Sequence, residues 1–156
     1  MAVHAVHAVH AVRAAQPADA AALDRLYQRV MAAADWLPAT APAAGSFAEA
    51  SRGEWVFVVG AAGGEVAGLI AVEPAKSFVH HLYVAEPGRR QGVGAALLAS
   101  LHGWLPRPWR LKCVCANHAA LSFYAALGWV DAGGGDGEQG TYRLLEFTDP
   151  SGTTTP

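Results

Sequence analysis

The sequence predicts an α/β fold with one mixed β-sheet of about six or seven strands and helices on both of its faces. The chain has 156 residues, which is the size of one domain with a single buried core. Segments with helical spacing of apolar residues alternate with short strand-like segments. Their order is a strand, a helix, a short helix, three strands, a helix, a strand, a helix and two strands. This order is typical of a mixed sheet covered on both sides.

The composition excludes several classes of protein. Hydrophobic residues make up 53% of the chain and charged residues 15%, which excludes a disordered or fibrous chain. No apolar run approaches the roughly 18–20 residues of a membrane-spanning helix. The formal charge of −2 gives no reason to expect nucleic acid or a membrane surface as a partner. The only cysteines, Cys113 and Cys115, are too few for a zinc site, so we expect no metal and interpret them as thiols in a reducing cytoplasm.

The chain divides into one domain and two short ends. The triplet Ala-Val-His occurs three times within residues 2–10, a period that suits neither a helix nor a strand. We therefore interpret residues 1–10 as a low-complexity extension, and the segment has no basic leader that would indicate a signal peptide. Residues 11–147 form the predicted single domain. Proline and threonine predict a loose tail over 148–156.

Glycine, proline and capping residues bound the predicted elements. Pro17 and Asp19 favour the first turn of a helix that ends before Pro38. Another helix is predicted to begin after Asn117, a good N-cap residue, and to end at Gly128, which suits the C-terminal cap. Further helices are predicted at 47–51 and 92–105. Strands are predicted at 12–14, 55–60, 65–73, 77–85, 109–115, 129–132 and 141–147, with a glycine-rich turn between the last two.

A candidate phosphate site lies between a predicted strand and a helix. Gly92 and Gly94 let the backbone turn tightly at a helix start, where unpaired N–H groups and the helix dipole favour an anion. Arg89 and Arg90 add positive charge. A P-loop would need Gly-Lys-Ser/Thr, and a dinucleotide fingerprint would need a third glycine where Leu97 stands. Taken alone, the segment could also be a glycine-rich turn with solvated arginines.

Two motifs together resemble the GNAT superfamily of N-acetyltransferases. The segment from His81 to Leu98 resembles motif A, a Leu-x-Val strand followed by Arg/Gln-x-x-Gly-x-Gly/Ala. The segment from Asn117 to Trp129 resembles motif B, Asn-x-x-Ala-x-x-Phe-Tyr-x-x-x-Gly-Phe, with Trp129 in place of phenylalanine. The resemblance spans about residues 11–147. It implies a GNAT-like fold in which the motif A strand and the next strand of the sheet splay apart.

The resemblance implies acetyl-CoA as co-substrate and a direct transfer of its acetyl group to a primary amine in a ternary complex. The cofactor's pantetheine arm would pair with strand backbone, and its pyrophosphate would bind loop amides. We expect a substitution at Gly94 to place bulk against that pyrophosphate. By family position, the cofactor-binding residues are Leu82, Tyr83, Val84, Arg89, Arg90, Gln91, Gly92, Val93, Gly94, Ala95, Asn117 and Tyr124. Asn117 has the alternative role of a helix cap.

Two residues are candidate catalytic groups. Tyr124 matches the family tyrosine that protonates the departing thiolate, and a phenol with a reference pKa of about 10 is protonated at neutral pH. Its alternative role is packing beside Phe123. The acceptor ammonium must lose a proton, but the motif A strand carries no carboxylate. We expect His80 to act as the base, since alternation puts it on the face of Leu82 and opposite His81. Its alternative role is that of a structural hydrogen-bonding residue.

The acceptor itself remains open. We favour a small-molecule amine over a peptide or protein amine, and a homodimer is possible. In the family, the acceptor site is lined by the loop after the first helix, here residues 35–38, and by the final hairpin. The alternatives from other classes are a non-catalytic CoA-binding or sensing module and an unrelated α+β binding domain with a fortuitous glycine turn.

Overall fold

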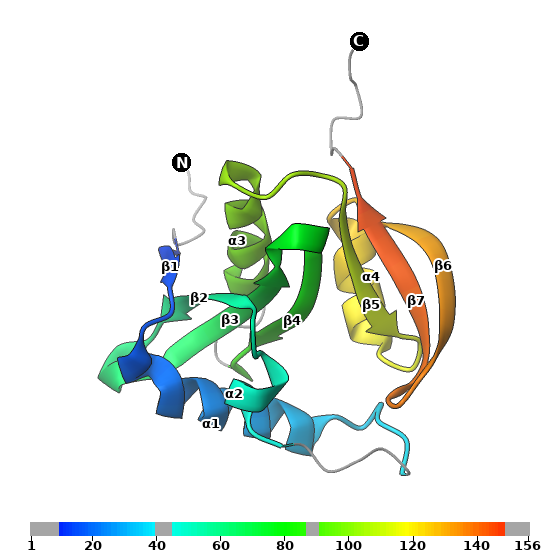
Figure 1. The fold of residues 1–156 in the computed structure, drawn as a ribbon. Helices are drawn as coiled ribbons and strands as arrows, with labels where there is room; N and C mark the ends of the chain where they lie inside the picture. Colours follow the sequence, from blue (N-terminus) through cyan, green and yellow to red (C-terminus); the bar gives the residue numbers. More distant parts are fainter. Residues whose placement is uncertain (1–9, 40–44, 87–90, 149–156) are drawn as a thin grey trace, which may run out of the picture.

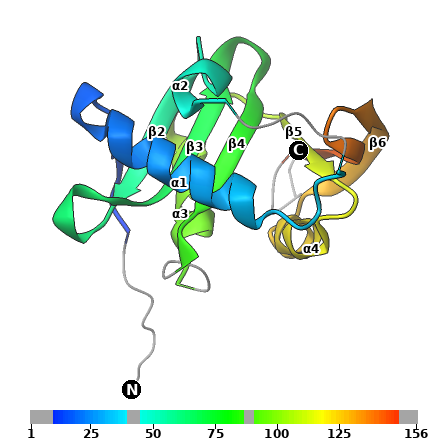
Figure 2. The same cartoon turned by 90° about the horizontal axis from the view of Figure 1, so that it is seen from below.

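A seven-stranded mixed sheet forms the centre of the computed structural model, which describes residues 10–39, 45–86 and 91–148. The strand order is β1-β2-β3-β4-β5-β7-β6. Figures 1 and 2 show α1 and α2 on one face and α3 and α4 on the other. The elements are β1 (Val12–Ala14), α1 (Ala20–Ala33), α2 (Phe47–Ala50), β2 (Trp55–Gly60), β3 (Val66–Glu73), β4 (Phe78–Val84), α3 (Val93–Ala99), β5 (Trp109–Val114), α4 (His118–Ala126), β6 (Val130–Gly137) and β7 (Gly140–Phe147). The predicted fold class is confirmed.

The sheet separates two hydrophobic clusters, one under each pair of helices. Apolar residues on one side of α1 pack with alternate residues of β2 and β3, such as Val58 and Leu69, which are fully buried. On the other face, α3 and α4 pack on the opposite residues of the same strands, including Ile70. Alternation along a strand sends successive side chains to opposite faces, so β3 is buried on both. Gly68 lets α3 approach closely, because a Cβ there would lie 2.8 Å from Cγ1 of Val93.

The sheet opens between its two halves. β4 and β5 are parallel, and only Phe78 and Val79 of β4 pair with β5, opposite Arg110 and Leu111. Strands β1 to β4 are antiparallel neighbours, and β5, β7 and β6 form a second antiparallel group. The predicted splay therefore occurs over the last five residues of β4. In Figure 1 the two strands diverge toward their C-terminal ends.

A β-bulge in β4 changes the face on which one side chain lies. Ala71 of β3 pairs with His81 and Val72 pairs with Val79, so His80 is an extra residue. Such a residue interrupts the alternation of side chains. The prediction that His80 shares a face with Leu82 is wrong, because the bulge turns His80 toward the α1/α2 face that also holds His81.

Two further elements differ from the prediction. The helix predicted over 92–105 is α-helical only through Ala99 and continues as a 3₁₀ turn over Ser100–Gly103. The glycine-rich segment predicted as a turn belongs to strand β6. Glycine is required there because a Cβ on Gly134 would lie 2.6 Å from the Tyr142 carbonyl oxygen of β7.

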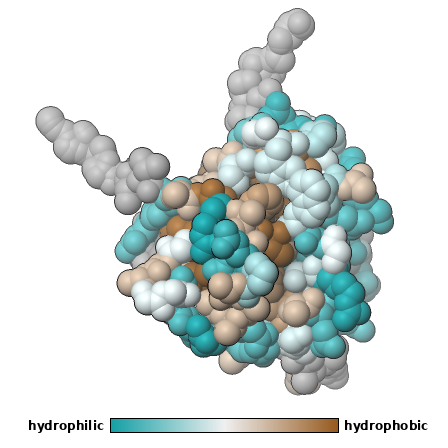
Figure 3. Space-filling view, turned by 60° about the vertical axis from the view of Figure 1, so that its left-hand side comes forward, coloured by the Kyte–Doolittle hydropathy of each residue, from teal (hydrophilic) through white to brown (hydrophobic). Residues whose placement is uncertain are grey.

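In the parts of the chain that the structure describes, no helix combines the length and the apolar character needed to cross a membrane. Figure 3 shows one side of the molecule, where apolar residues gather in a central area among polar ones. The Trp55 side chain is 55% exposed and stacks on Trp104, with ring centroids 5.3 Å apart.

An ion pair ties β1 to the start of α1 and predicts how stability depends on pH. Arg13 donates two hydrogen bonds to Asp19, at 2.8 and 3.0 Å, and the Gln16 N–H donates a third. These bonds lower the pKa of Asp19 to about 2. A carboxyl with a depressed folded-state pKa stabilises the fold above its unfolded pKa, and this contribution is lost as pH falls through the folded value.

Replacing Asp19 by Asn should therefore lower the free energy of unfolding at pH 7, and the difference from wild type should shrink as pH falls from about 4 toward 2. Urea unfolding across this pH range measures the difference. Asp35→Asn, at an exposed carboxylate, is the matched control. A deficit in Asp19→Asn that is the same at every pH would contradict the ionic origin.

Candidate functional site

The exposed edge of β4 forms the first part of the site. Beyond Val79 the strand has no β5 partner, so its backbone groups on that edge are left without sheet hydrogen bonds. Leu82, Tyr83 and Val84 lie on this segment, as the sequence predicts, and pair with β3 on their other edge. An extended ligand that carries amide groups could pair with this edge as an added strand would.

The start of α3 forms the second part of the site. Gly92 is the N-cap residue with φ 86°, a left-handed conformation that favours glycine. The Ala96 N–H donates to the Gly92 carbonyl, so the N–H groups of Val93 and Ala95 precede the first bond of the helix. Such groups can bind an anion. Arg89 and Arg90, the predicted cationic residues, lie outside the described residues.

The N-terminal extension reaches this loop. Nε2 of His10, the last histidine of the Ala-Val-His repeat, lies 2.6 Å from the Gln91 carbonyl oxygen, 81 residues away in the chain. The side chain of Gln91 is not used in this contact and is exposed. A substitution of the Gln91 side chain should therefore leave the backbone of this loop undisturbed.

Gly94 has a packing role that the sequence interpretation did not predict. A Cβ on this residue would lie 3.1 Å from Cζ of Phe123 and 3.4 Å from Cγ2 of Val84. It would point into the contact of α3 with α4 and β4, so a substitution there would first meet Phe123 and Val84. Gly94 is a glycine because three elements meet at it.

Helix α4 brings two predicted residues to the same side of the sheet as α3. Asn117 is its N-cap, and its side-chain oxygen accepts a 3.2 Å hydrogen bond from the Ala120 N–H. The capping role is thus confirmed. Because the side-chain oxygen is used in the cap, only the NH₂ group of Asn117 could contact a cofactor. Tyr124 is 8% exposed and packs against Phe123 and Trp129, with ring centroids 5.2 and 5.6 Å away.

The environment of Tyr124 keeps its phenol protonated. Burial raises the pKa of Tyr124, and the neighbouring Cys113 and Tyr83 raise it further. Cys113 is itself a buried free thiol whose pKa burial raises to about 11. A protonated phenol beside the gap between β4 and β5 can donate a proton to a thiolate that forms there.

The opposite face of β4 carries a linked set of polar side chains. Nδ1 of His81 lies 2.9 Å from the Tyr83 hydroxyl, and Nε2 of the same ring lies 3.2 Å from the Ala50 carbonyl oxygen of α2. Burial lowers the pKa of His81, which favours the neutral ring. Tyr27 of α1 packs over this pair, 5.8 Å from the Tyr83 ring.

Glu54 lies next to both histidines. Its Oε1 is 3.8 Å from Nε2 of His81, and its Oε2 is 3.9 Å from Nδ1 of His80. Among the described residues, Oε1 is the buried side-chain oxygen that has no hydrogen-bond partner. His80 is more exposed, and its Nε2 lies 3.0 Å from Oε1 of Glu73. Sequence reasoning missed Glu54, because only the register of β2, β3 and β4 brings it beside the histidines.

The two segments expected to line an acceptor site meet at the open end of the gap. A Cβ on Gly140, at the β6–β7 turn, would lie 4.0 Å from Cδ of Pro38 and 3.9 Å from Cγ1 of Val114. Figure 1 shows the loop after α1 running toward this turn, past the ends of β4 and β5. The loop and the turn therefore lie side by side next to the C-terminal end of β5.

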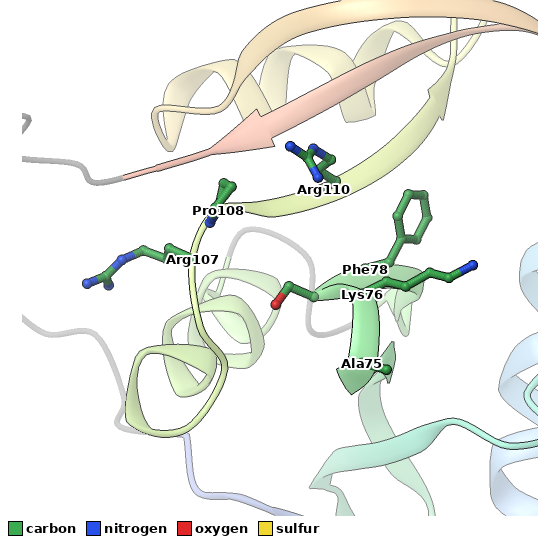
Figure 4. A pocket seen from close by; sticks show the side chains of 7 residues that line it. Ala75, Lys76, Phe78, Arg107, Pro108 and Arg110 are labelled. Carbon is green, nitrogen blue, oxygen red and sulfur yellow. The ribbon is translucent and has the colours of Figure 1, made fainter.

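An open cavity lies at the other end of β4 and β5. It measures about 520 Å³ and is lined by residues of the turn before β4 and the segment before β5. Figure 4 shows the side chains of Lys76 and Arg107 pointing away from each other. Its cationic groups do not converge, so we assign the site to the gap and the α3 loop.

The chain matches a known protein family over most of its length. The profile of the acetyltransferase (GNAT) family matches residues 18–129. No curated protein sequence matches the chain.

Solved structures share the fold at low sequence identity. Ribosomal-protein-alanine N-acetyltransferase from Brucella melitensis is 18% identical, with 88% of this chain and 99% of that chain covered and a TM-score of 0.69. A mutant of spermidine N-acetyltransferase SpeG from Vibrio cholerae is 16% identical, with 90% and 94% covered and a TM-score of 0.63. The protein yncA from Salmonella typhimurium, solved with its cofactor acetyl-CoA, is 17% identical, with 94% and 97% covered and a TM-score of 0.68.

The loop before α3 predicts how charge at Gln91 affects binding of acetyl-CoA. Gln91→Glu should weaken binding about fivefold and Gln91→Lys should strengthen it by a similar factor, since a charge about 4 Å from an anion in water is worth about 1 kcal/mol. Both effects should shrink at high salt. Isothermal titration calorimetry measures the affinities. Equal affinities for both variants would show that the anion does not bind at this loop.

Proposed function

Because the chain belongs to the GNAT family of acetyltransferases, we propose that it transfers the acetyl group of acetyl-CoA directly to a primary amine of a small molecule. The observation that carries this proposal is the free edge of β4 beside the start of α3. The extended pantetheine arm of the cofactor needs an unpaired strand edge. Its pyrophosphate needs an anion site close to that edge. The structure offers both on neighbouring segments.

In this proposal the cofactor follows the gap. The pantetheine arm pairs with the backbone of Leu82, Tyr83 and Val84, and the NH₂ group of Asn117 donates to it from α4. The pyrophosphate binds the amides of residues 91–95, with Arg89 and Arg90 beside them. An N–H of β4 polarises the thioester carbonyl as an oxyanion donor does.

Acetyl transfer then needs one attack and one proton donation. The amine nitrogen attacks the thioester carbon, the carbon–sulfur bond breaks, and the departing thiolate takes a proton from the Tyr124 hydroxyl. The acetylated nitrogen then loses one N–H proton, which restores the Tyr124 hydroxyl. The support for Tyr124 is its location on the α3/α4 face and the burial that keeps its phenol protonated. Direct attack in a ternary complex also suits the site, because this route needs no covalent acetyl-enzyme.

The acceptor side of the site supports a small amine. Pro38 and Gly140 lie close together and belong to the two segments that line the acceptor site in this family. Among the proteins that share the fold, the Vibrio cholerae enzyme is named for spermidine, a small polyamine. We therefore favour a small molecule with a primary amine.

The variant Tyr124→Phe tests the proposed acid. It keeps the ring and its packing on Trp129 and removes only the hydroxyl. General acid catalysis is typically worth about 10²–10⁴-fold, so kcat should fall by this factor while acetyl-CoA affinity changes little. The measurement is CoA release with an amine found by screening a small-amine library. Wild-type turnover by the variant would return Tyr124 to a packing role.

A further inference from the structure

Five polar side chains form a path across the α1/α2 face of β4 that the proposed function has not used. It begins at the half-buried Tyr83 hydroxyl, 2.9 Å from His81, and continues to Glu54, 3.8 Å from the other ring nitrogen. His80 follows at 3.9 Å, and Glu73 ends the path 3.0 Å from His80. The exposed fraction of the histidine side chains rises from 15% at His81 to 37% at His80. The path therefore leads from the Tyr83 hydroxyl toward a more exposed histidine.

The hydrogen-bond partners of His81 determine which of its ring nitrogens can accept a proton. The Ala50 carbonyl oxygen can only accept, so the neutral ring carries its hydrogen on Nε2. Its Nδ1 is then an acceptor, and the Tyr83 hydroxyl donates to it. The hydroxyl oxygen of Tyr83 keeps its lone pairs free to accept a hydrogen from another donor. A proton arriving at Tyr83 can thus be passed to His81.

The two faces of β4 separate the cofactor from the acceptor. Leu82 and Val84 pack toward α3 and α4, the side that carries Tyr124 and the α3 loop. A cofactor bound there leaves the thioester carbon accessible from the other face of the gap. Tyr83 lies on that other face, and it is close enough to Tyr124 to raise the pKa of that phenol. The acceptor amine therefore arrives on the side of Tyr83.

We propose that Tyr83 and His81 take the proton from the acceptor's ammonium group and that Glu54 and His80 pass it to solvent. The inference rests on the proposed acetyl transfer. The ammonium N–H bond breaks and an O–H bond forms on Tyr83, while the original Tyr83 proton moves to Nδ1 of His81. The imidazolium then releases its Nε2 proton to the Glu54 carboxylate, which leaves a neutral ring with its hydrogen on Nδ1. After the product departs, the Tyr83 hydroxyl proton moves to water as the Nδ1 hydrogen passes back to Tyr83, and Nε2 takes up a proton from solvent through His80 and Glu54. No electrons are transferred.

Glu54 suits this role because of its unpartnered oxygen. Oε1 is buried, has no hydrogen-bond partner among the described residues, and faces Nε2 of His81. A carboxylate at this position stabilises the imidazolium that forms. Burial raises the pKa of Glu54, which makes it a better proton acceptor than an exposed carboxylate. It also lines an open cavity of about 300 Å³ between α1, α2 and β2, through which water can reach it.

Side chains and backbone groups face His81 and its neighbour His80 from each element packed against them. Tyr83 and His80 lie on β4, Tyr27 on α1, Glu54 before β2 and Glu73 on β3, where it bonds His80. Helix α2 contributes the Ala50 carbonyl and the Phe47 ring. The relay works only while His81 is neutral, and burial lowers its pKa from 6.5. Activity of the wild type should therefore persist to a pH below 6.5 and fall as His81 becomes charged.

A pair of small nucleophiles tests the relay in the variant Tyr83→Phe. Ethylamine is a cation at pH 7.5 and must lose a proton, whereas hydroxylamine is uncharged and need not. Transfer to ethylamine should fall by about 10²-fold or more in the variant, since general base catalysis is typically worth 10²–10⁴-fold. Transfer to hydroxylamine and the affinity for acetyl-CoA should stay close to wild type. Tyr27→Phe is the matched control, because it removes a neighbouring hydroxyl that does not bond His81, and it should keep both activities.

The pH dependence tests His81 separately from its packing. In His81→Gln and Tyr83→Phe, transfer to ethylamine should rise about tenfold per pH unit between pH 7 and 9, because only the free amine then reacts. The wild type should show a much flatter profile. Equal losses with ethylamine and hydroxylamine, or a flat profile in both variants, would overturn the relay. A wild-type protein that transfers acetyl groups to neither amine would instead contradict the proposed function.

Discussion

The early divergence of β4 from β5 is the constraint on which the rest of the site depends. The strands pair at only two positions, which leaves the backbone of the last five residues of β4 without sheet partners on one edge. Backbone polar groups in a protein interior need hydrogen-bond partners. A ligand with amide groups along an extended arm satisfies this need, and acetyl-CoA carries such an arm. The missing hydrogen bonds of the sheet are thus the basis of the binding mode that we propose for the cofactor.

The same divergence gives the two faces of β4 different chemistry. Close packing at Gly68 and Gly94 brings α3 and α4 against the sheet, so this face can hold the cofactor and the buried phenol of Tyr124. The α1/α2 face instead keeps polar side chains in a largely apolar surrounding, with His81 bonded to both Tyr83 and Ala50. In the mechanism that we propose, one strand therefore separates the proton donor to the thiolate from the groups that accept a proton from the amine.

The sequence predicts the elements well because their signals are local. Apolar spacing, Pro17 and the cap at Asn117 fix where helices begin, and the motif around Gly92 places the loop at the start of α3. The bulge at His80 could not be predicted, because it depends on the register between β3 and β4. The position of Glu54 depends on that register too, so no local pattern indicated it. The run of glycines in β6 resembled a turn because the need for glycine comes from Tyr142 on the next strand.

Hydrogen–deuterium exchange with and without acetyl-CoA tests the central claim most directly. If the cofactor lies in the gap, the amides of Leu82 to Val84 and of residues 91–95 should exchange more slowly when it is bound, because the ligand supplies their missing partners. The amides around the cavity at Ser77 and Arg107 should be unaffected. Slower exchange confined to that cavity, or no change along β4, would contradict the account.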